Sequence, residues 1–406
     1  MSAGQTQPRR AHQPDYVLAL VIFVLLAVGL VMIYSISPIL SFKVSSTLNK
    51  NYYFYNHLLN VALGIVAWIV VTAIDYRVWR RLAAPLLGLA GLFLFALTIP
   101  GLASTKNGAT RWLALGPFSF QPSEFLKLAL ILYLAVWFER RGDRLRSVTE
   151  GMLPFVIIMG LVGLAVAVFQ KNLSTTIVMA LAAMAMYFVA GISWKQMAAL
   201  VTGALALGWI LIITFPHRLA RLATFLNPGK VTAAAGYQIN QALIAVGSGG
   251  ILGLGLGKSI QVHGYLPEVA NDSIYAIISE EFGLIGAILI LALFAILIVR
   301  GFRIARDAPD TFSRLVATGI SVWLFVQSLV NVAAMLSLVP LTGIPLPFVS
   351  YGGSSMVFSL VGAGILLNIS KYTVNEVSHA TDSLRRRNSW AHNANPSRHQ
   401  RPQNAR

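Results

Sequence analysis

Ten apolar segments joined by polar connections constrain this chain more than any other feature. They cover residues 16–36, 57–74, 84–100, 121–138, 152–169, 173–190, 197–215, 273–299, 315–338 and 348–369. Because one α-helix needs about 20 apolar residues to cross a bilayer, we expect an all-α polytopic membrane protein with about ten transmembrane helices. The composition agrees, since 11% of the residues are charged, against about 25% in soluble domains.

The positions of the basic residues predict the orientation of these spans. With both termini in the cytoplasm, most of the 31 lysine and arginine residues fall in cytoplasmic segments, as the positive-inside rule requires. We therefore expect a cytoplasmic tail over 1–15, a membrane domain over 16–370, and a basic, disordered tail over 371–406. The net charge of +17 is then a topology signal, and no nucleic-acid partner is expected.

This orientation places a large extracytoplasmic loop, residues 216–272, between spans 7 and 8. Connections of this length are usually functional or disordered. Its stretch 247–257 holds six glycines, but a glycine-rich loop without a strand before it and a helix after it is a weak phosphate-binding signal. We expect half-inserted helices or a mobile loop there, and no nucleotide or organic cofactor. The absence of cysteine excludes thiolate chemistry.

The stretch 263–283 is an acidic island in this apolar chain. Asp272 stands directly before the eighth span, where it can cap the helix or act on a substrate, and position alone leaves both readings open. Glu280 and Glu281 lie about two turns further on, and we expect them to pair with a basic residue inside the bundle. Glu268 is a loop acid of unassigned role.

Glu124 and Lys127 are three residues apart, on one face of a helix that Pro122 is expected to begin. A structural ion pair is the favoured interpretation. Cations on the outer face can bind phosphate or diphosphate, or they can be interfacial side chains that snorkel; they are Arg111, Lys127, Arg218, Arg221 and Lys258.

Small and polar residues fill the segment Pro347–Ser355, where the last span begins. Such residues allow close helix packing, or they line a polar cavity with Ser350, Ser354 and Ser355. The aromatic residues of the outer face fit an interfacial belt: Tyr52, Tyr53, Phe54, Tyr55 and Trp112. The outer histidines are too scattered to indicate a metal site: His57, His217 and His263.

Together these stretches resemble the SEDS family (shape, elongation, division and sporulation) of FtsW and RodA proteins. The matching pieces occur in the family's order and cover nearly all of 16–370: Gly108 to Trp112, Gln121 to Glu124 with Lys127, Gly236 to Gln238 with Gln241, Leu266 to Asp272, Glu280 to Gly283, and Pro347 to Ser355. The chain departs from the family at 170–172, where Gln-Lys-Asn replaces the usual Gln-Pro-Asp.

The resemblance implies a peptidoglycan glycosyltransferase of the bacterial cytoplasmic membrane. Such enzymes polymerise lipid II, a disaccharide-peptide on undecaprenyl diphosphate, at the outer face of the membrane. The implied partners are a class B penicillin-binding protein, which is a transpeptidase, and other membrane proteins of division or elongation. The aspartate that matches Asp272 is the family's essential residue. Chain length and the basic tail favour FtsW over RodA.

Our hypothesis is that Asp272 is the general base that activates an acceptor hydroxyl. We expect Arg111, Lys127 and Arg221 to stabilise the leaving diphosphate, with Mg²⁺ or Mn²⁺ as a candidate cofactor, and Glu124 to orient Lys127. The remaining predicted substrate-binding residues are Gln238, Lys258, Ser350 and Ser354. The alternatives are a lipid II flippase or transporter and a non-catalytic divisome scaffold.

Overall fold

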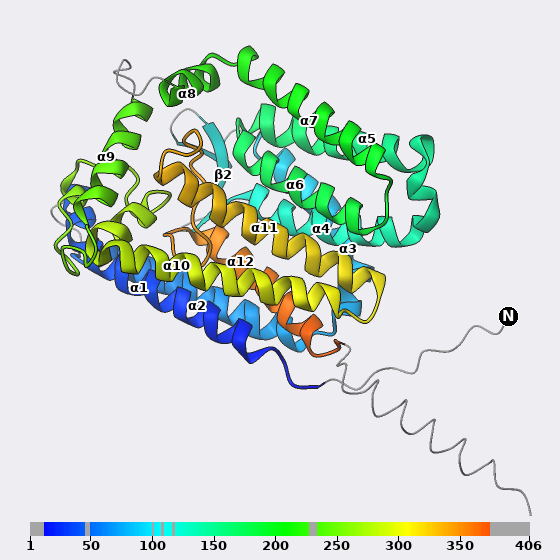
Figure 1. Cartoon of the computed structure of the whole chain (residues 1–406), viewed down its shortest axis with the longest axis horizontal. Helices are drawn as coiled ribbons and strands as arrows, with labels where there is room; N and C mark the ends of the chain where they lie inside the picture. The colour runs from blue at the N-terminus through cyan, green and yellow to red at the C-terminus, as the bar shows by residue number, and fades with distance from the viewer. Residues whose placement is uncertain are drawn as a thin grey trace, which may run out of the picture.

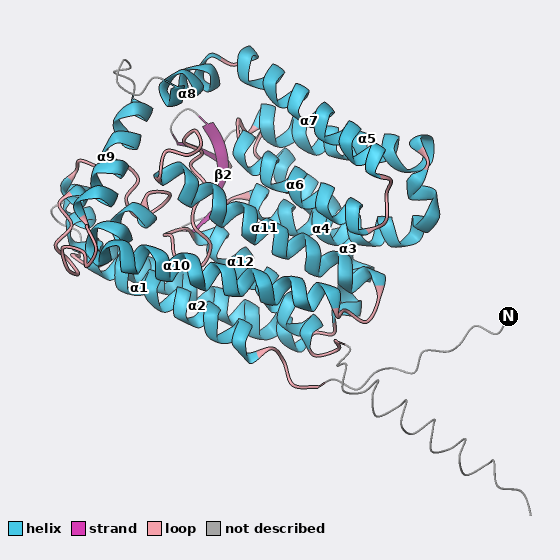
Figure 2. Cartoon of the chain, in the orientation of Figure 1, coloured by secondary structure: helices cyan, strands magenta, loops and turns pink. Residues whose placement is uncertain are grey.

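The computed structural model of the chain describes residues 12–44, 49–99, 101–106, 109–115, 118–226 and 234–373. It is a helical bundle with a small sheet near one end (Figure 1, Figure 2). The elements before residue 150 are α1 (Tyr16–Val44), α2 (Tyr52–Ala73), α3 (Tyr76–Ala96), β1 (Ala103–Lys106), β2 (Ala109–Leu115), β3 (Phe118–Phe120), α4 (Pro122–Arg141), the 3-10 helix η1 (Gly142–Arg146) and the π-helix η2 (Val148–Met152). The later elements are α5 (Leu153–Gly163), the π-helix η3 (Leu164–Phe169), α6 (Leu173–Val189), α7 (Trp194–Thr214), α8 (Pro216–Leu226), α9 (Ala234–Ser248), the 3-10 helix η4 (Gln261–His263), α10 (Ile274–Arg306), α11 (Thr311–Met335) and α12 (Gly353–Ser370).

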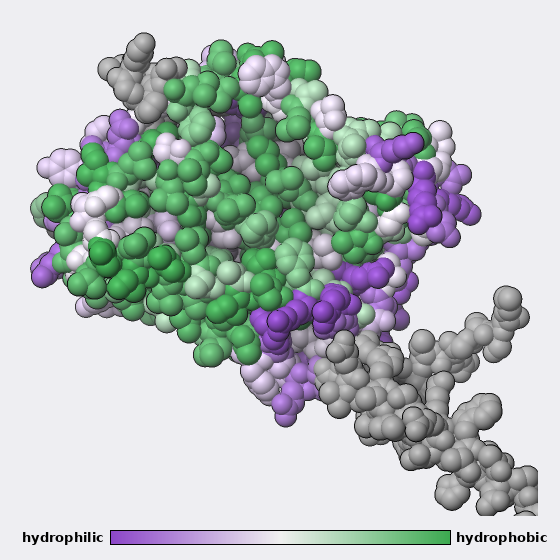
Figure 3. Space-filling model, in the orientation of Figure 1, coloured by the Kyte–Doolittle hydropathy of each residue, from purple (hydrophilic) through white to green (hydrophobic). Residues whose placement is uncertain are grey.

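The polytopic helical fold expected from the sequence is confirmed. Within the described residues, eight helical segments are long and apolar enough to cross a membrane: α1, α2, α3, the continuous segment Val148–Phe169, α7, α10, α11 and α12. The two other expected spans coincide with α4, which carries charged residues, and α6, which has 17 residues. A broad apolar surface lies between hydrophilic residues at opposite ends of the molecule (Figure 3). The count of ten and the orientation stay predictions.

Both ends of the membrane domain lie together. The His12 amide donates to the Lys371 carbonyl at 2.8 Å, and the Arg300 guanidinium forms an ion pair of 2.7 Å with Asp15. The Asp15 amide also donates to the Ser370 hydroxyl. A chain that enters and leaves on one side of a bilayer must cross it an even number of times, which agrees with the predicted topology.

α11 is at the centre of the bundle and packs against α4, α6, α10 and α12. α1 and α2 run along one edge of the view and α7 and α8 along the opposite edge, with α10, α11 and α12 between them (Figure 1). α2 packs along α12, and its buried face continues through Val61, Trp68 and Val71. Among the long apolar helices α7 is the most exposed, with no buried residue in its most apolar stretch.

The strands β1, β2 and β3 form an antiparallel sheet of order β1-β2-β3, which adds strands to the expected all-α fold. Leu113 pairs with Ala103 on one side and Phe120 on the other. Arg111 is the extra residue of a β-bulge in β2, because Trp112 pairs with Ser104 and Thr110 pairs with Thr105. A bulge breaks the alternation of side chains between the two faces, and the Arg111 guanidinium reaches the carbonyls of Gln170 and Lys171.

The predicted loop 216–272 also contains regular structure, namely α8, α9 and η4. α9 packs against α10, so this region is a folded part of the bundle. Its glycine-rich stretch 249–257 is packed rather than mobile. The amides of Leu254 and Gly255 donate to the carbonyls of Glu280 and Glu281, each at 3.0 Å. Of the two expectations for this stretch, the mobile loop is wrong, and half-insertion into the membrane stays a prediction.

These bonds are made where α10 is interrupted at Gly283, which has φ 65° and ψ −161°. Only glycine adopts this backbone geometry at little cost. A Cβ at Gly283 would lie 2.4 Å from the Gly253 amide nitrogen, so the two chains touch through their backbones. Backbone groups freed at membrane depth need partners inside the protein, and the glycine-rich stretch supplies them. The break separates Ile274–Phe282 from the rest of the helix.

The expectation that Glu280 and Glu281 pair with a basic residue is wrong for the described residues. The Glu280 carboxylate accepts hydrogen bonds from the Ser259 hydroxyl and, at 3.0 Å, from the Ile260 amide. Glu281 accepts from the Ser35 hydroxyl at 3.2 Å. Donors from a folded loop satisfy Glu280, and a donor from α1 satisfies Glu281. Sequence spacing could not reveal either contact.

Candidate active site

Asp272 lies at the end of the folded loop, one residue before the helix cap. α10 begins at Ile274 with Ser273 as its N-cap, and no side chain caps it. The capping role considered for Asp272 is therefore not used. Its carboxylate is 7% exposed and receives the Gln238 side-chain amide at 3.5 Å, while the Asn331 amide donates to its backbone carbonyl at 2.8 Å. The carboxylate is therefore held by Gln238 and makes no capping hydrogen bond to the helix.

Burial raises the pKa of Asp272 from 3.8 to about 7. The negative charge of Glu268 raises the pKa further, while Arg221 and the Gln238 hydrogen bond lower it. Removal from water disfavours the charged carboxylate. A pKa near the working pH is what a general base requires, because the group must be unprotonated before the reaction and basic enough to take a proton.

Two arginines approach this site from α8 and β2. Arg221 is exposed, donates to the Leu341 carbonyl at 3.3 Å, and lies close enough to Asp272 to lower the pKa of that carboxyl. Arg111 donates to the carbonyls of Gln170 at 3.1 Å and Lys171 at 2.6 Å. Burial, followed by repulsion from Arg221, lowers the pKa of Arg111. Two of the predicted diphosphate ligands are thus neighbours, but Arg111 already holds backbone carbonyls.

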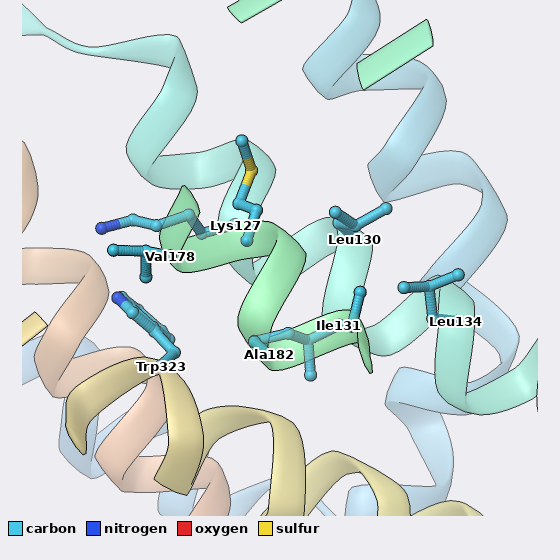
Figure 4. Close-up of a pocket in the computed structure, with 9 residues that line it drawn as sticks. Lys127, Leu130, Ile131, Leu134, Val178, Ala182 and Trp323 are labelled. Atoms are coloured by element: carbon cyan, nitrogen blue, oxygen red, sulfur yellow. The ribbon is translucent and has the colours of Figure 1, made fainter. Parts of the chain in front are cut away.

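Lys127 lies in a different environment, inside the bundle and 3% exposed. Its ammonium forms an ion pair of 2.9 Å with Glu124 and donates to the Gln327 side-chain oxygen at 2.9 Å. It also lies 4.8 Å from the centre of the Trp323 ring. The cavity beside it has a volume of about 10 Å³ and is otherwise lined by apolar side chains such as Leu130 (Figure 4). That is about the space of one water, too small for a diphosphate.

Gln327 and Asn331 lie between this ion pair and Asp272, and neither was predicted from the sequence. Gln327 contacts Lys127, and Asn331 contacts Asp272. They are one turn apart on α11, and both are buried. Gln327 donates to the Pro345 carbonyl at 3.0 Å, and Asn331 donates to the Ile344 carbonyl at 2.7 Å as well as to Asp272. Two amides four residues apart in an apolar span were the available signal.

The segment 341–344 is where several parts of the site meet. Leu341 accepts from Arg221, the Thr342 carbonyl accepts from the Ser174 hydroxyl at 3.0 Å, and a Cβ at Gly343 would lie 3.7 Å from the Asp272 carboxylate. Gly343 has φ 68°, a conformation that glycine adopts readily. Side chains of α8, α6 and α11 thus all contact this segment, which lies next to the Asp272 carboxylate.

The remaining predicted residues are Ser350, Ser354 and Lys258. The Ser350 hydroxyl accepts the Leu346 amide at 2.8 Å within the loop before α12, and the Ser354 hydroxyl accepts the Gln121 amide at 2.9 Å, which ties the start of α12 to the start of α4. Lys258 is exposed in the glycine-rich stretch, next to the Ser259 that binds Glu280. Asp272, Gln238 and Arg221 form the centre of the site.

The sequence profile of the Cell cycle protein family, which comprises FtsW, RodA and SpoVE, matches residues 16–375. The chain belongs to the SEDS family.

Relatives in this family align with most of the SEDS chain. It is 40% identical over 367 residues to the probable peptidoglycan glycosyltransferase FtsW of Trichlorobacter lovleyi, over 90% of this chain and 95% of that protein. It is 38% identical to the stage V sporulation protein E of Bacillus subtilis, over 89% of this chain and 98% of that protein. The resemblance seen in the sequence is confirmed, and FtsW is the name that several of these relatives carry.

Solved structures of SEDS proteins share the fold. A peptidoglycan synthase complex that coordinates polymerisation and crosslinking contains a chain with a TM-score of 0.74 and 25% identity, over 89% of this chain and 99% of that chain. The rod shape determining protein RodA of Thermus thermophilus has a TM-score of 0.63 and 26% identity, over 89% of this chain and 98% of that one. The family and the apolar helices make this a multi-pass protein of the cytoplasmic membrane.

The departure from the SEDS pattern at 170–172 changes the backbone of that turn. Lys171 has φ 54°, which proline, fixed near −65°, cannot adopt. Asn172 accepts the Thr175 amide at 3.2 Å and caps α6, as an aspartate would. Arg111 holds the Gln170 and Lys171 carbonyls of this turn. The turn is a variant geometry stabilised by an arginine from the sheet.

Proposed function

We infer that this SEDS protein is a peptidoglycan glycosyltransferase that polymerises lipid II at the outer face of the membrane, with Asp272 as its general base. The observation that carries the inference is the buried Asp272 carboxylate, with a pKa of about 7, held by Gln238 and next to the exposed Arg221.

The reaction proceeds by direct displacement. A hydroxyl of the acceptor sugar attacks the anomeric carbon of the donor, and Asp272 takes the hydroxyl proton as the new glycosidic bond forms. The bond to diphosphate breaks, and its electron pair leaves with undecaprenyl diphosphate. One base and no covalent intermediate give inversion at that carbon, by analogy with inverting glycosidases.

The cations divide into one that contacts substrate and two that position the site. Arg221 is exposed, and we assign it to the diphosphate charge that grows in the transition state. Arg111 fixes the turn at Gln170 and Lys171. Lys127, with Glu124, acts through Gln327 on the segment next to Asp272.

A divalent cation is a separate proposal. Mg²⁺ is usually held by one or two carboxylates together with substrate phosphates. Asp272 and Glu268 are the carboxylates near this site, and the described residues contain no group of three side chains that could hold a metal. Mg²⁺ or Mn²⁺ would therefore need oxygens from the substrate. Removal by EDTA followed by return of each metal tests the requirement, with polymer yield as the measurement.

The proposed protein partner is a penicillin-binding protein, and a structural neighbour supports this, since it belongs to a peptidoglycan synthase complex that coordinates polymerisation and crosslinking. We propose that it is a class B transpeptidase, and that other membrane proteins of division join the assembly. Similarity to relatives named FtsW favours division over elongation. Purification with each candidate transpeptidase, followed by size-exclusion chromatography, tests the pairing.

Incubation of the purified protein and its transpeptidase with lipid II tests the activity. We expect glycan strands from the wild type and none from Asp272→Asn. Fluorescent lipid II in vesicles provides the matched measurement of transfer between leaflets. Transfer without glycan would contradict the proposal and support a flippase.

A further inference from the structure

A polar stripe interrupts the apolar surface of α2 at its first two turns. It consists of Tyr53, Asn56, His57 and Asn60, whose spacing puts them on one face of the helix. The same face continues as apolar residues further along α2. The stripe faces the start of α12, because a Cβ at Gly353 would lie 3.4 Å from the Asn60 side-chain oxygen. Polar side chains inside a membrane span are energetically costly, and they usually have a function.

His57 is the least satisfied member of the stripe. Its side chain is 0% exposed, and neither ring nitrogen has a hydrogen-bond partner among the described residues. Buried polar atoms are nearly always hydrogen-bonded. An imidazole with two unpaired nitrogens therefore indicates that a polar group is to be received there.

Tyr351 covers His57, and its ring belongs to an aromatic group. The ring centres of Tyr351 and His57 are 5.8 Å apart, and those of Tyr351 and Tyr53 are 5.4 Å apart. Tyr351 also forms a side-chain hydrogen bond with Asn56.

This group adjoins the loop that carries Asp272. The Tyr351 amide donates to the Ala270 carbonyl at 2.8 Å, two residues before Asp272. The cationic Arg221 belongs to α8, on the opposite side of the bundle from α2 (Figure 1). The catalytic loop is thus bordered by a diphosphate-binding side and by an aromatic, amide-rich side.

We propose that Tyr351 and Tyr53, with Asn56, Asn60 and His57 behind them, form a subsite for an N-acetylated sugar of the substrate or growing glycan. The proposal rests on the glycosyltransferase activity proposed above. Tyrosine rings stack on the C–H faces of sugars, and amide and imidazole groups hydrogen-bond hydroxyl and acetamido groups. Binding shifts the Tyr351 ring and supplies the partner that His57 lacks.

Tyr55 is the matched control. Tyr55 lies on the same turn of α2 as Tyr53 and is 53% exposed. Its ring packs against Phe54, and it lies outside the polar stripe. It fits the interfacial belt expected from the sequence. If all the tyrosines here served only as a belt, replacement of Tyr55 and of Tyr351 would have the same effect.

The test uses the full chain with its transpeptidase partner and lipid II. Tyr351→Leu should raise the KM for lipid II or shorten the glycan strands, by roughly two- to tenfold, the factor that corresponds to the loss of one aromatic contact. Raised KM assigns the subsite to the lipid-linked sugar, and shorter strands assign it to the growing glycan. Tyr351→Phe should keep a KM and a strand length close to those of the wild type, and Tyr55→Leu should match the wild type in both.

His57→Leu provides a second measurement. It should reproduce the defect while leaving the melting temperature unchanged or raised, because an unpaired polar group is removed. Tyr53→Leu replaces Tyr351→Leu if the latter does not fold. Unchanged KM and strand length in all of these variants would overturn the subsite while wild-type polymerisation continues. Failure of the wild type to make glycan would instead overturn the proposed function.

Discussion

Replacement of Asp272 by asparagine should remove activity and at the same time stabilise the protein. The carboxylate is 7% exposed, and burial raises its pKa from 3.8 to about 7. That difference corresponds to a cost on the order of 4 kcal/mol for keeping the group ionised in the folded state. Asparagine has nearly the same shape, retains the backbone bond from Asn331 and carries no charge, so the cost disappears.

The sign of the pH dependence follows from proton binding. Between pH 3.8 and about 7 the folded protein retains a proton on Asp272 that the unfolded chain has lost, so stability falls as pH rises through this window. Asp272→Asn lacks that fall. Its stability advantage should therefore be absent near pH 4, grow up to pH 7 and remain constant above it. Melting temperatures in detergent at several pH values measure this.

Activity should depend on pH in the opposite sense. Only the unprotonated carboxylate can accept a proton, so wild-type kcat/KM should rise with pH and level off above about 7. Full polymerisation by Asp272→Asn would refute the assignment of the base. An inflection near pH 4, or an asparagine variant less stable than the wild type at pH 8, would refute the argument from burial.

Three further changes test other parts of the site. Lys127→Met leaves the Glu124 carboxylate buried and unpaired, which should cost about 3–5 kcal/mol; melting temperatures should fall, and adding Glu124→Gln should restore them. Gly283→Ala places a Cβ 2.4 Å from the Gly253 amide at φ 65°, so it should destabilise the fold by more than about 1 kcal/mol, whereas alanine at the open position Gly88 should not. Arg221→Ala should lower kcat/KM and move its pH inflection upward, because Arg221 lowers the pKa of Asp272; an unmoved inflection would separate the two residues.

The sequence determined the class of fold and the family. Long apolar segments require helices in a bilayer, since no other isolated segment satisfies its own backbone there, and these helices formed where expected. The helix start at Pro122 and the ion pair between Glu124 and Lys127 also followed from local spacing. The position of Asp272 before α10 could be read from the sequence, although the choice between cap and base could not.

Only the tertiary structure decided which of the predicted diphosphate ligands remain exposed. Arg111, Lys127 and Arg221 look alike in the sequence, yet the first holds a turn, the second is buried, and the third remains exposed. It also decided that α10 breaks at Gly283 and that hydrogen-bond donors from a distant loop satisfy Glu280. Periodicity reports which face of a helix is apolar. The partner of a buried charge depends on contacts between segments far apart in the chain, and these exist only after the bundle has packed.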